Sequence, residues 1–235
     1  MKVFSFERKL NLLIGIPSGD FWVRHFGMSL CNMMGYLMST PVPGFREQRM
    51  QPMVLSGSIL SRARSKLVQH ALKEKFTHIL FVDTDQDFPR DTAHRLLQLG
   101  KDVVGCNIAI KQVPSKPTAR SKSPNPGGDE VFTDPDSPPL EVVWRLGTGI
   151  MLIDVRVFEK IGARVFAIDW KEELQDYQGE DWSMCEALEA AGYKIWVDHR
   201  LSDEVGHWGL FRYTHEVVGE KVLVEDEGPK VIGEA

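Results

Sequence analysis

Cysteine is scarce in this chain, and two common nucleotide-binding loops are missing. The three cysteines, Cys31, Cys106 and Cys185, lie far apart and form no Cys-x-x-Cys pair. This spacing implies neither a disulfide framework nor a zinc ribbon, and it favours the reducing environment of a cytoplasm. The sequence contains neither a P-loop nor a Gly-x-Gly-x-x-Gly loop. NTP hydrolysis and dinucleotide redox chemistry therefore have little support.

An excess of positive charge is also missing. The chain has 28 lysine and arginine residues against 33 aspartate and glutamate residues, which gives a net charge of −5. Proteins that coat nucleic acid or acidic membranes need the opposite balance, so we do not expect this chain to be one of them.

No apolar run in the sequence fits a signal peptide or an uninterrupted membrane span. The first nine residues contain no continuous apolar stretch and no small-residue cleavage site, so we expect no secretory signal. The stretch 21–38 has sufficient length for a span, but Arg24, His25 and Asn32 interrupt it. We predict a buried helix there, in a protein without stable membrane insertion.

At 235 residues, of which 43% are hydrophobic, the chain is long enough for one large domain with a substantial core. In the first half, apolar runs that predict strands alternate with segments of helical periodicity. The predicted strands are 11–16, 78–82 and 102–108, and the predicted helices are 58–75 and 92–99. This alternation is typical of a sheet with parallel neighbours and helical crossovers, so we predict an α/β fold.

The pattern breaks at 111–139, where proline, serine, glycine and aspartate are abundant. A connection of this length is either a functional lid or a mobile loop. Regular patterns then return, with strands predicted at 140–146, 150–153 and 193–197 and helices at 155–161 and 181–191. The last twenty residues, 216–235, hold six acids against two lysines and predict a peripheral or partly disordered tail.

The most informative motif is Asp83-Thr84-Asp85, which directly follows the apolar run 79–82. A strand directs alternate side chains to the same face, so Asp83 and Asp85 are expected to point together into the crevice beyond the sheet. Two carboxylates held so close repel each other, and a hard divalent cation that also takes phosphate oxygens relieves the repulsion. The motif therefore predicts a metal site, whereas Asp87 is predicted to cap the following turn.

The segment around this motif resembles the metal-binding Asp-x-Asp region of GT-A glycosyltransferases, particularly the small bacterial and phage enzymes related to family two. Further motifs resemble this family in the same order along the chain. They are Arg64-Ser65, where an Arg-Asn pair is usual, the Gly-x-Gly loop Gly147-Thr148-Gly149, the Glu-Asp motif Glu180-Asp181, and His207 as a late metal-site histidine.

The resemblance implies a GT-A fold, which is a Rossmann-like nucleotide-diphospho-sugar transferase fold with a mixed, mostly parallel sheet flanked by helices. It implies one catalytic domain over residues 1–215, with 111–139 as a flexible loop on the acceptor side and 216–235 as an acidic tail. It further implies a hexosyltransferase-type enzyme of a bacterial or phage-infected cytoplasm. This enzyme would move a sugar from a nucleotide-diphosphate donor, with a UDP-sugar expected, to an acceptor hydroxyl with inversion.

The implied cofactor is Mn²⁺ or Mg²⁺, held by Asp83, Asp85 and His207. It would act as a Lewis acid that neutralises the charge growing on the diphosphate leaving group. Asp85 is the expected direct ligand, and Asp83 is expected to face the ribose as well. An imidazole in an oxygen-rich site favours Mn²⁺ without deciding the choice. The alternative role for His207 is a structural histidine beside Trp208.

In inverting transfer, a carboxylate opposite the leaving group takes the proton from the attacking hydroxyl. Asp181 is the expected base, with Glu180 binding a sugar or acceptor hydroxyl, and an exchange of these roles stays open. The alternative is an acidic first turn favoured by the helix dipole. The implied donor-nucleotide residues are Pro17, Ser18, Arg64, Asp83 and Thr84, and the implied sugar or acceptor residues are Gly147, Thr148, Gly149 and Trp182.

Other functions compete with sugar transfer. A haloacid-dehalogenase-type phosphatase also carries Asp-x-Asp, but usually at its first strand. A sugar nucleotidyltransferase would carry a basic, glycine-rich loop after the first strand, whereas residues 15–20 contain no lysine or arginine. The non-enzymatic alternative is a GT-A-like protein that binds a sugar nucleotide or glycan without turnover. The acceptor stays open among a glycan, a protein and a hydroxymethylated DNA base. A phosphate-bearing acceptor would suit the basic residues Lys111, Lys116, Arg120 and Lys122, which otherwise form a solvated loop.

Overall fold

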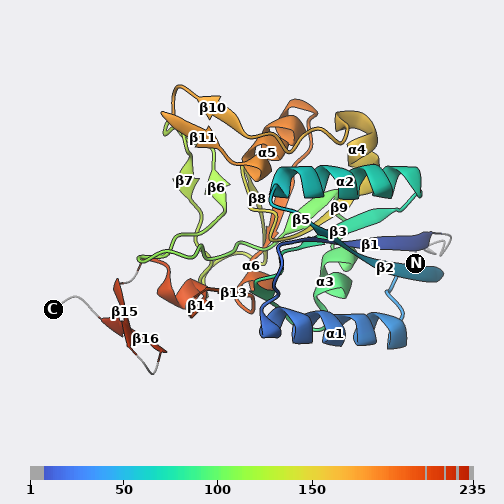
Figure 1. The fold of residues 1–235 in the computed structure, drawn as a ribbon, viewed down its shortest axis with the longest axis horizontal. Helices are drawn as coiled ribbons and strands as arrows, with labels where there is room; N and C mark the ends of the chain where they lie inside the picture. The colour runs from blue at the N-terminus through green and yellow to red at the C-terminus, as the bar shows by residue number, and fades with distance from the viewer. Residues whose placement is uncertain (1–7, 210, 220, 226–227, 233–235) are drawn as a thin grey trace.

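A seven-stranded mixed sheet forms the centre of the computed structural model, which describes residues 8–209, 211–219, 221–225 and 228–232 (Figure 1). The strand order is β2-β1-β3-β9-β5-β12-β8. The bounds are β1 (Lys9–Ser18), β2 (Glu47–Ser56), β3 (His78–Val82), β5 (Val103–Gly105), β8 (Leu140–Val143), β9 (Ile150–Asp154) and β12 (Ile195–Asp198). Strands β8 and β9 run against the other five, so the predicted mixed sheet is confirmed, with three parallel and three antiparallel pairings.

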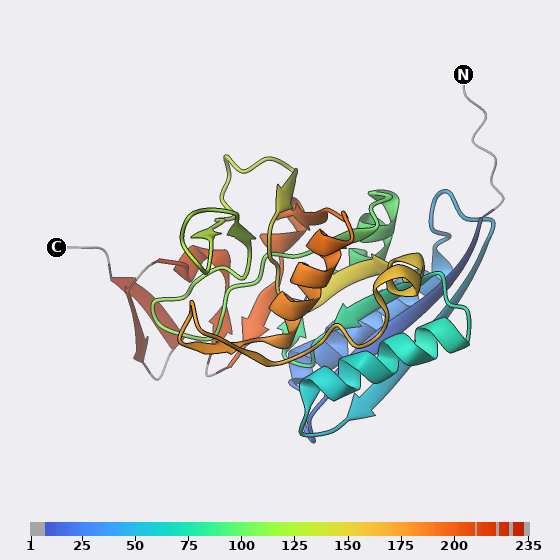
Figure 2. The same cartoon turned by 90° about the horizontal axis from the view of Figure 1, so that it is seen from above.

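Helices cover both faces of this sheet (Figures 1 and 2). On one face lie α1 (Arg24–Ser39) and α3 (Thr92–Gln98), and on the other lie α2 (Leu60–Lys73), α4 (Val155–Ile161) and α5 (Glu180–Ala190). The short helix α6 (His199–Ser202) follows β12. Because both faces are covered, the central strands are apolar on both sides: in β3, Ile79 and Phe81 join one core cluster while Leu80 and Val82 join the other.

Two elements of the first half differ from their sequence patterns. Strand β2 was not predicted, because its side chains alternate between exposed and half-buried and Pro52 interrupts it, a residue that sheets accept at an edge. Helix α1 is amphipathic rather than buried: Phe26, Leu30, Met33 and Leu37 face the core, whereas Met28 is exposed. No helix among the described residues is long and apolar enough to cross a membrane.

A buried asparagine is among the residues that hold the segment 111–139 against the domain. Asn107 Nδ2 donates to the Val131 carbonyl at 2.7 Å, and Asn107 Oδ1 accepts from the Ala119 amide at 2.9 Å. The segment contains the short strands β6 (Arg120–Ser121) and β7 (Asp129–Glu130), which pair with each other. Farther along, β10 (Asp169–Lys171) and β11 (Asp176–Gln178) form a second small hairpin that leads into α5.

A three-stranded sheet joins the end of β3 to the last part of the chain. It consists of β4 (Gln86–Asp87), β13 (Gly206–Trp208) and β14 (Arg212–Tyr213), with the 3₁₀ turn His215–Val217 after it. Asp87 does not cap a turn, because its carboxylate accepts from Arg212 Nε at 3.0 and 3.1 Å and so ties β4 to β14. The acidic tail contains β15 (Lys221–Glu225) and β16 (Gly228–Ile232), which pair antiparallel and extend from the body of the domain (Figure 1).

The close approach of β5 to β9 requires a glycine and gives a test of the fold. A Cβ atom on Gly105 would lie 2.6 Å from the backbone oxygen of Ile150. We predict that Gly105→Ala lowers the free energy of unfolding by about 1–3 kcal/mol, as overpacked cores do, in urea titrations. The control is Gly27→Ala in α1, where no atom lies within 4 Å. This change should raise stability by roughly 0.5–1 kcal/mol, and equal effects of both changes would contradict the strand pairing.

Candidate functional site

The predicted site residues lie where the parallel strands β1 and β3 end. Strand β1 ends at Ser18 and β3 at Val82, and Asp83 follows directly. Helix α5 begins nearby with Glu180 and Asp181, and an ion-pair network connects it to Asp83. This end of an α/β sheet is where ligands of such folds bind, because the strands leave a crevice there.

A buried arginine holds this end of the sheet together. Arg64 lies on the core-facing side of α2 together with Leu67 and Val68, and it is only 2% exposed. Its Nη2 donates to both carboxylate oxygens of Asp83, at 2.9 and 3.0 Å, and its Nη1 pairs with Glu180. Burial opposes the charge of the guanidinium, but the neighbouring carboxylates more than compensate and raise the pKa of Arg64. A single cation thus links α2, β3 and α5.

Asp181 is a neighbouring acid with a raised pKa, and Arg64 forms its ion pairs with Asp83 and Glu180 instead. Burial, followed by the negative charge of Glu180, raises the pKa of Asp181 to about 6, although Arg64 acts in the opposite direction. Its Oδ1 accepts a hydrogen bond from the Trp182 amide at 2.9 Å. A carboxyl group with such a pKa exchanges its proton near neutral pH, which is the property that a general base needs.

Asp85 has the opposite environment. Burial alone would raise its pKa, but hydrogen bonds from His207 and Lys111 and their positive charge lower the pKa of Asp85 to about 2. Lys111 Nζ lies 2.5 Å from Asp85 Oδ2, and His207 Nε2 lies 3.4 Å from the same oxygen. The carboxylate is therefore ionised at any physiological pH and has two nitrogen neighbours.

His207 reaches Asp85 because β13 pairs with β4, with His207 opposite Gln86. The amide of Trp208 also donates to the backbone oxygen of Asp85 at 2.7 Å. His207 Nδ1 lies 3.0 Å from the Ala109 carbonyl oxygen. A carbonyl oxygen only accepts, so Nδ1 carries a proton and donates it there, and Nε2 is directed at Asp85 Oδ2. Histidine ligands of metals are commonly held in this way.

The three predicted metal ligands do not gather at one point. Asp85 and His207 lie together, whereas Asp83 is turned towards Arg64. The reason is local: the chain turns after Val82, with the Gln86 amide donating to the Asp83 carbonyl at 3.3 Å, so strand alternation no longer applies. Within the described residues, no three histidine, cysteine, aspartate or glutamate side chains are close enough to hold a metal ion. Of the three predicted ligands, only Asp85 and His207 thus lie side by side.

The loop Gly147-Thr148-Gly149 packs directly behind Asp83. The Gly149 carbonyl accepts from the Asp83 amide at 2.9 Å, and a Cβ atom on Gly149 would lie 2.7 Å from Ile108 Cδ1. Thr148 Oγ1 and Gln86 Oε1 are buried without a hydrogen-bond partner in the described part of the chain. Gln86 and Lys111 are the two residues of this region whose place at the site the sequence patterns did not predict.

The predicted nucleotide residues border the same end of the sheet. Pro17 and Ser18 are buried at the end of β1, and Ser18 Oγ accepts from Trp22 Nε1 at 2.8 Å. The Thr84 carbonyl accepts from the Val23 amide and so holds the start of α1 against the Asp83 turn. Trp182 lies on α5 with its ring over the guanidinium of Arg145, at 4.4 Å. Pro17 and Ser18 thus lie at the end of β1, Thr84 lies just beyond the end of β3, and Trp182 lies in the first turn of α5.

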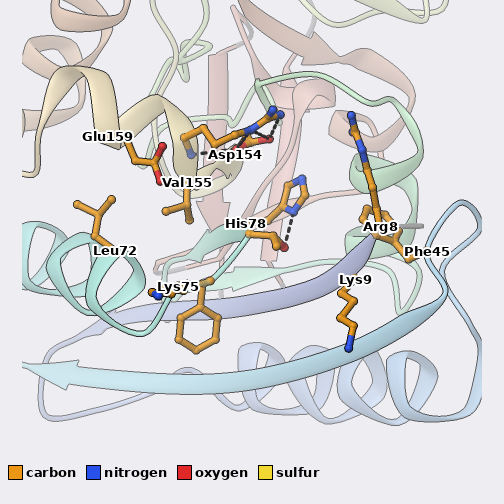
Figure 3. Close-up of a pocket in the computed structure, with 12 residues that line it drawn as sticks. Arg8, Lys9, Phe45, Leu72, Lys75, His78, Asp154, Val155 and Glu159 are labelled. Atoms are coloured by element: carbon orange, nitrogen blue, oxygen red, sulfur yellow. Dashed lines mark hydrogen bonds and ion pairs between the residues drawn. The ribbon is translucent and has the colours of Figure 1, made fainter. Parts of the chain in front are cut away.

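A separate cavity of about 540 Å³ lies at the opposite end of β1 and β3 (Figure 3). His78 and Lys75 line it together with Phe45 and Leu72, and Arg156 neutralises Asp154 at its wall. Burial, the largest cause, lowers the pKa of His78. None of the predicted site residues lines this cavity.

Comparison with known proteins supports the architecture. No protein-family model matches the chain, and no curated protein matches it. The crystal structure of A197 from STIV is similar, with a TM-score of 0.55 and 16% sequence identity over 95% of this chain and 93% of that chain. At this identity the likeness concerns the fold alone, which is a mixed α/β sheet flanked by helices.

Because the pKa of Asp181 is raised, we predict that replacing this residue stabilises the protein by an amount that depends on pH. The folded pKa of about 6 lies above the ordinary value of 3.8, so folding binds a proton between these values and the ionised carboxylate destabilises the native state above pH 6. Asp181→Asn should therefore raise the free energy of unfolding by about 1–3 kcal/mol at pH 7.5 and change it little at pH 4. Urea unfolding at both pH values measures this difference.

The control for this experiment is Asp169→Asn, which removes an exposed carboxylate of the β10–β11 hairpin. It should change stability by less than about 0.5 kcal/mol at either pH. Equal effects of Asp181→Asn at pH 4 and pH 7.5 would show that the carboxyl group does not titrate as described.

Proposed function

We propose that the protein is a metal-dependent glycosyltransferase of the GT-A type, which moves a sugar from a nucleotide-diphosphate donor, expected to be a UDP-sugar, to an acceptor hydroxyl with inversion. The observation that carries this proposal is a pair of differently tuned carboxylates at one end of the sheet. The pKa of Asp85 is about 2 and that of Asp181 is about 6. Two acids whose pKa values differ in this way are suited to two roles, Asp85 as a permanent anion and Asp181 as a proton acceptor.

Asp85 and His207 fit a divalent cation. The ring of His207 is held at Nδ1 by the Ala109 carbonyl, and its Nε2 and Asp85 Oδ2 lie 3.4 Å apart. A carboxylate beside an imidazole favours a cation, and Lys111 supplies one 2.5 Å from Asp85 Oδ2. Mn²⁺ or Mg²⁺ bound here would neutralise charge on a diphosphate, whose oxygens and water would complete the ligand set. Lys111 would then be free to contact a phosphate oxygen.

Arg64 and Asp83 would orient the nucleotide side of the donor. Both oxygens of Asp83 already accept from Arg64, but an ionised carboxylate has about four acceptor positions, so ribose hydroxyls can bind as well. The ends of β1 and β3 bring Ser18 and Thr84 to the same side. The role that these residues perform is to hold the donor in one orientation, which lowers the entropic cost of transfer.

Asp181 is suited to accept the proton of the attacking hydroxyl. The acceptor oxygen forms a bond to the anomeric carbon, the bond from that carbon to the diphosphate oxygen breaks, and its electron pair leaves with the nucleotide. The acceptor proton passes to Asp181, which is ionised above pH 6. Glu180 is held by Arg64, and this ion pair supports Asp181 rather than Glu180 as the base.

The competing functions receive less support from the same contacts. A phosphatase of the haloacid-dehalogenase type would use Asp83 as a nucleophile, yet both of its oxygens are engaged by a buried arginine. A binding protein without turnover would need no acid with a pKa of about 6. The three free cysteines support a cytoplasmic location for the enzyme.

Turnover of a panel of UDP-sugars with Mn²⁺ tests the proposal. We predict metal-dependent release of UDP whose rate rises with pH through about 6, because Asp181 must be ionised. Asp181→Asn should lower kcat by roughly 10²- to 10⁴-fold, which is the usual contribution of a general base. Binding of the donor, measured by calorimetry, should not change in this variant.

Asp85→Asn should instead weaken donor binding in the presence of Mn²⁺, since the variant loses a metal ligand. Asp91→Asn, at the start of α3, is the matched control and should behave as the wild type. Full transfer activity of Asp181→Asn would refute the assignment of the base, and metal-independent turnover would refute the metal site.

Lys111 gives a second test, which needs no turnover. Its ammonium competes with a metal for Asp85 Oδ2, so Lys111→Ala should tighten the binding of Mn²⁺ alone about two- to fivefold, as expected for losing a partly exposed ion pair. Calorimetry with Mn²⁺ measures the change. Lys116→Ala is the control, because Lys116 pairs with Glu130. Unchanged or weaker binding in Lys111→Ala would contradict a metal position at Asp85.

A further inference from the structure

The β10–β11 hairpin carries two exposed aromatic rings that have no role in the core. Trp170 is 46% exposed and Tyr177 is 64% exposed, and they are direct partners across the two strands. Their ring centroids lie 5.3 Å apart at an interplanar angle of 78°. Trp170 Nε1 donates to Glu172 Oε1 at 3.0 Å, which holds the indole ring in place. Exposed aromatic pairs of this kind mark binding surfaces, because leaving their apolar faces in contact with water is unfavourable in free energy.

This pair lies close to the candidate base. Strand β11 ends at Gln178, and α5 begins two residues later at Glu180 (Figure 1). Four residue steps separate Tyr177 from Asp181, so their Cα atoms are at most about 14 Å apart. A ligand that lies on the hairpin is therefore within about 14 Å of the chain segment that carries Asp181.

The charges around the rings disfavour a phosphate-bearing ligand. The hairpin carries four acids, Asp169, Glu172, Glu173 and Asp176, and one base, Lys171, whose ammonium pairs with Glu186 at 3.0 Å. A polyanion placed over this surface would be repelled by the uncompensated carboxylates.

The basic residues of the segment 111–139 do not offset this repulsion. Each of the four cations that could have formed a phosphate-binding patch has a carboxylate partner. These pairs are Lys111 with Asp85, Lys116 and Arg120 with Glu130, and Lys122 with Glu189. Nucleic acid would have to break such pairs before gaining any contact, and it would gain little from counterion release.

From these observations we propose that the hairpin is the docking surface for a neutral glycan, which makes a carbohydrate the acceptor class. This inference rests on the proposed function. The C–H face of a pyranose packs on an aromatic ring, and its hydroxyl groups donate to carboxylates, so rings surrounded by acids match a sugar chain. The glycan lies across Trp170 and Tyr177 and presents one hydroxyl group to Asp181.

The experiment measures binding of neutral oligosaccharides to the full chain without donor or metal. The probes are cellohexaose, maltohexaose and laminarihexaose, observed by calorimetry and by the indole resonances in NMR spectra. At least one hexasaccharide should bind. Its affinity should stay the same between about 50 mM and about 500 mM NaCl, because binding of a neutral ligand releases no counterions. Trp170→Ala and Tyr177→Ala should each weaken that binding about tenfold or more, as loss of a stacking ring does.

The matched control is Tyr193→Ala, which removes a ring at the opposite end of the sheet, just before β12, and should leave the affinity unchanged. Thermal unfolding of each variant checks that the fold is intact. A duplex containing 5-hydroxymethylcytosine and an arginine-rich dodecapeptide are the competing probes.

Three results would overturn the inference: no hexasaccharide binds, hexasaccharide binding survives both hairpin substitutions, or only the duplex or the peptide binds at the hairpin. Failure of the proposed function has a different signature. In that case an oligosaccharide binds and depends on Trp170 and Tyr177, yet no UDP-sugar is turned over in its presence.

Discussion

The buried guanidinium of Arg64 is the interaction on which the rest of the candidate site depends. It binds Asp83 at the end of β3 and Glu180 at the start of α5, so two segments almost a hundred residues apart in the sequence are fixed to one helix. Removing one partner of such a buried pair typically costs about 3–5 kcal/mol, because the other charge is left without compensation. This contact fixes Asp83 and Glu180, which are close neighbours of Asp85 and Asp181 in the chain.

The acids divide into two groups because cations are distributed unevenly around them. Asp85 lies beside Lys111 and His207, and its pKa falls to about 2. Asp181 lies beside Glu180, whose partner Arg64 is shared with Asp83, and its pKa rises to about 6. In the proposed function, this difference assigns Asp85 to a bound cation and Asp181 to proton transfer, which are the two roles that sugar transfer from a diphosphate donor requires.

Much of this arrangement could be predicted from local sequence patterns. The predictions that were wrong have identifiable physical causes. The continuous apolar run of β3 and the helical spacing of α2 are strong signals because both faces of the sheet are covered. The half-exposed pattern of β2 is a weak signal, and β2 was missed. The expected convergence of Asp83 and Asp85 assumed that the strand continues, whereas the chain turns after Val82. Contacts such as Lys111 with Asp85 depend on long-range packing and leave no pattern in the sequence.

The most direct test of the central claim is a crystal structure of the protein soaked with Mn²⁺ and UDP, with the metal located by its anomalous scattering. The account predicts one strong Mn²⁺ peak between Asp85 Oδ2 and His207 Nε2, the diphosphate of UDP beside it, and the Lys111 ammonium displaced from Asp85. A structure in which Mn²⁺ avoids Asp85, or in which UDP occupies the cavity beside His78 at the other end of the sheet, would contradict it.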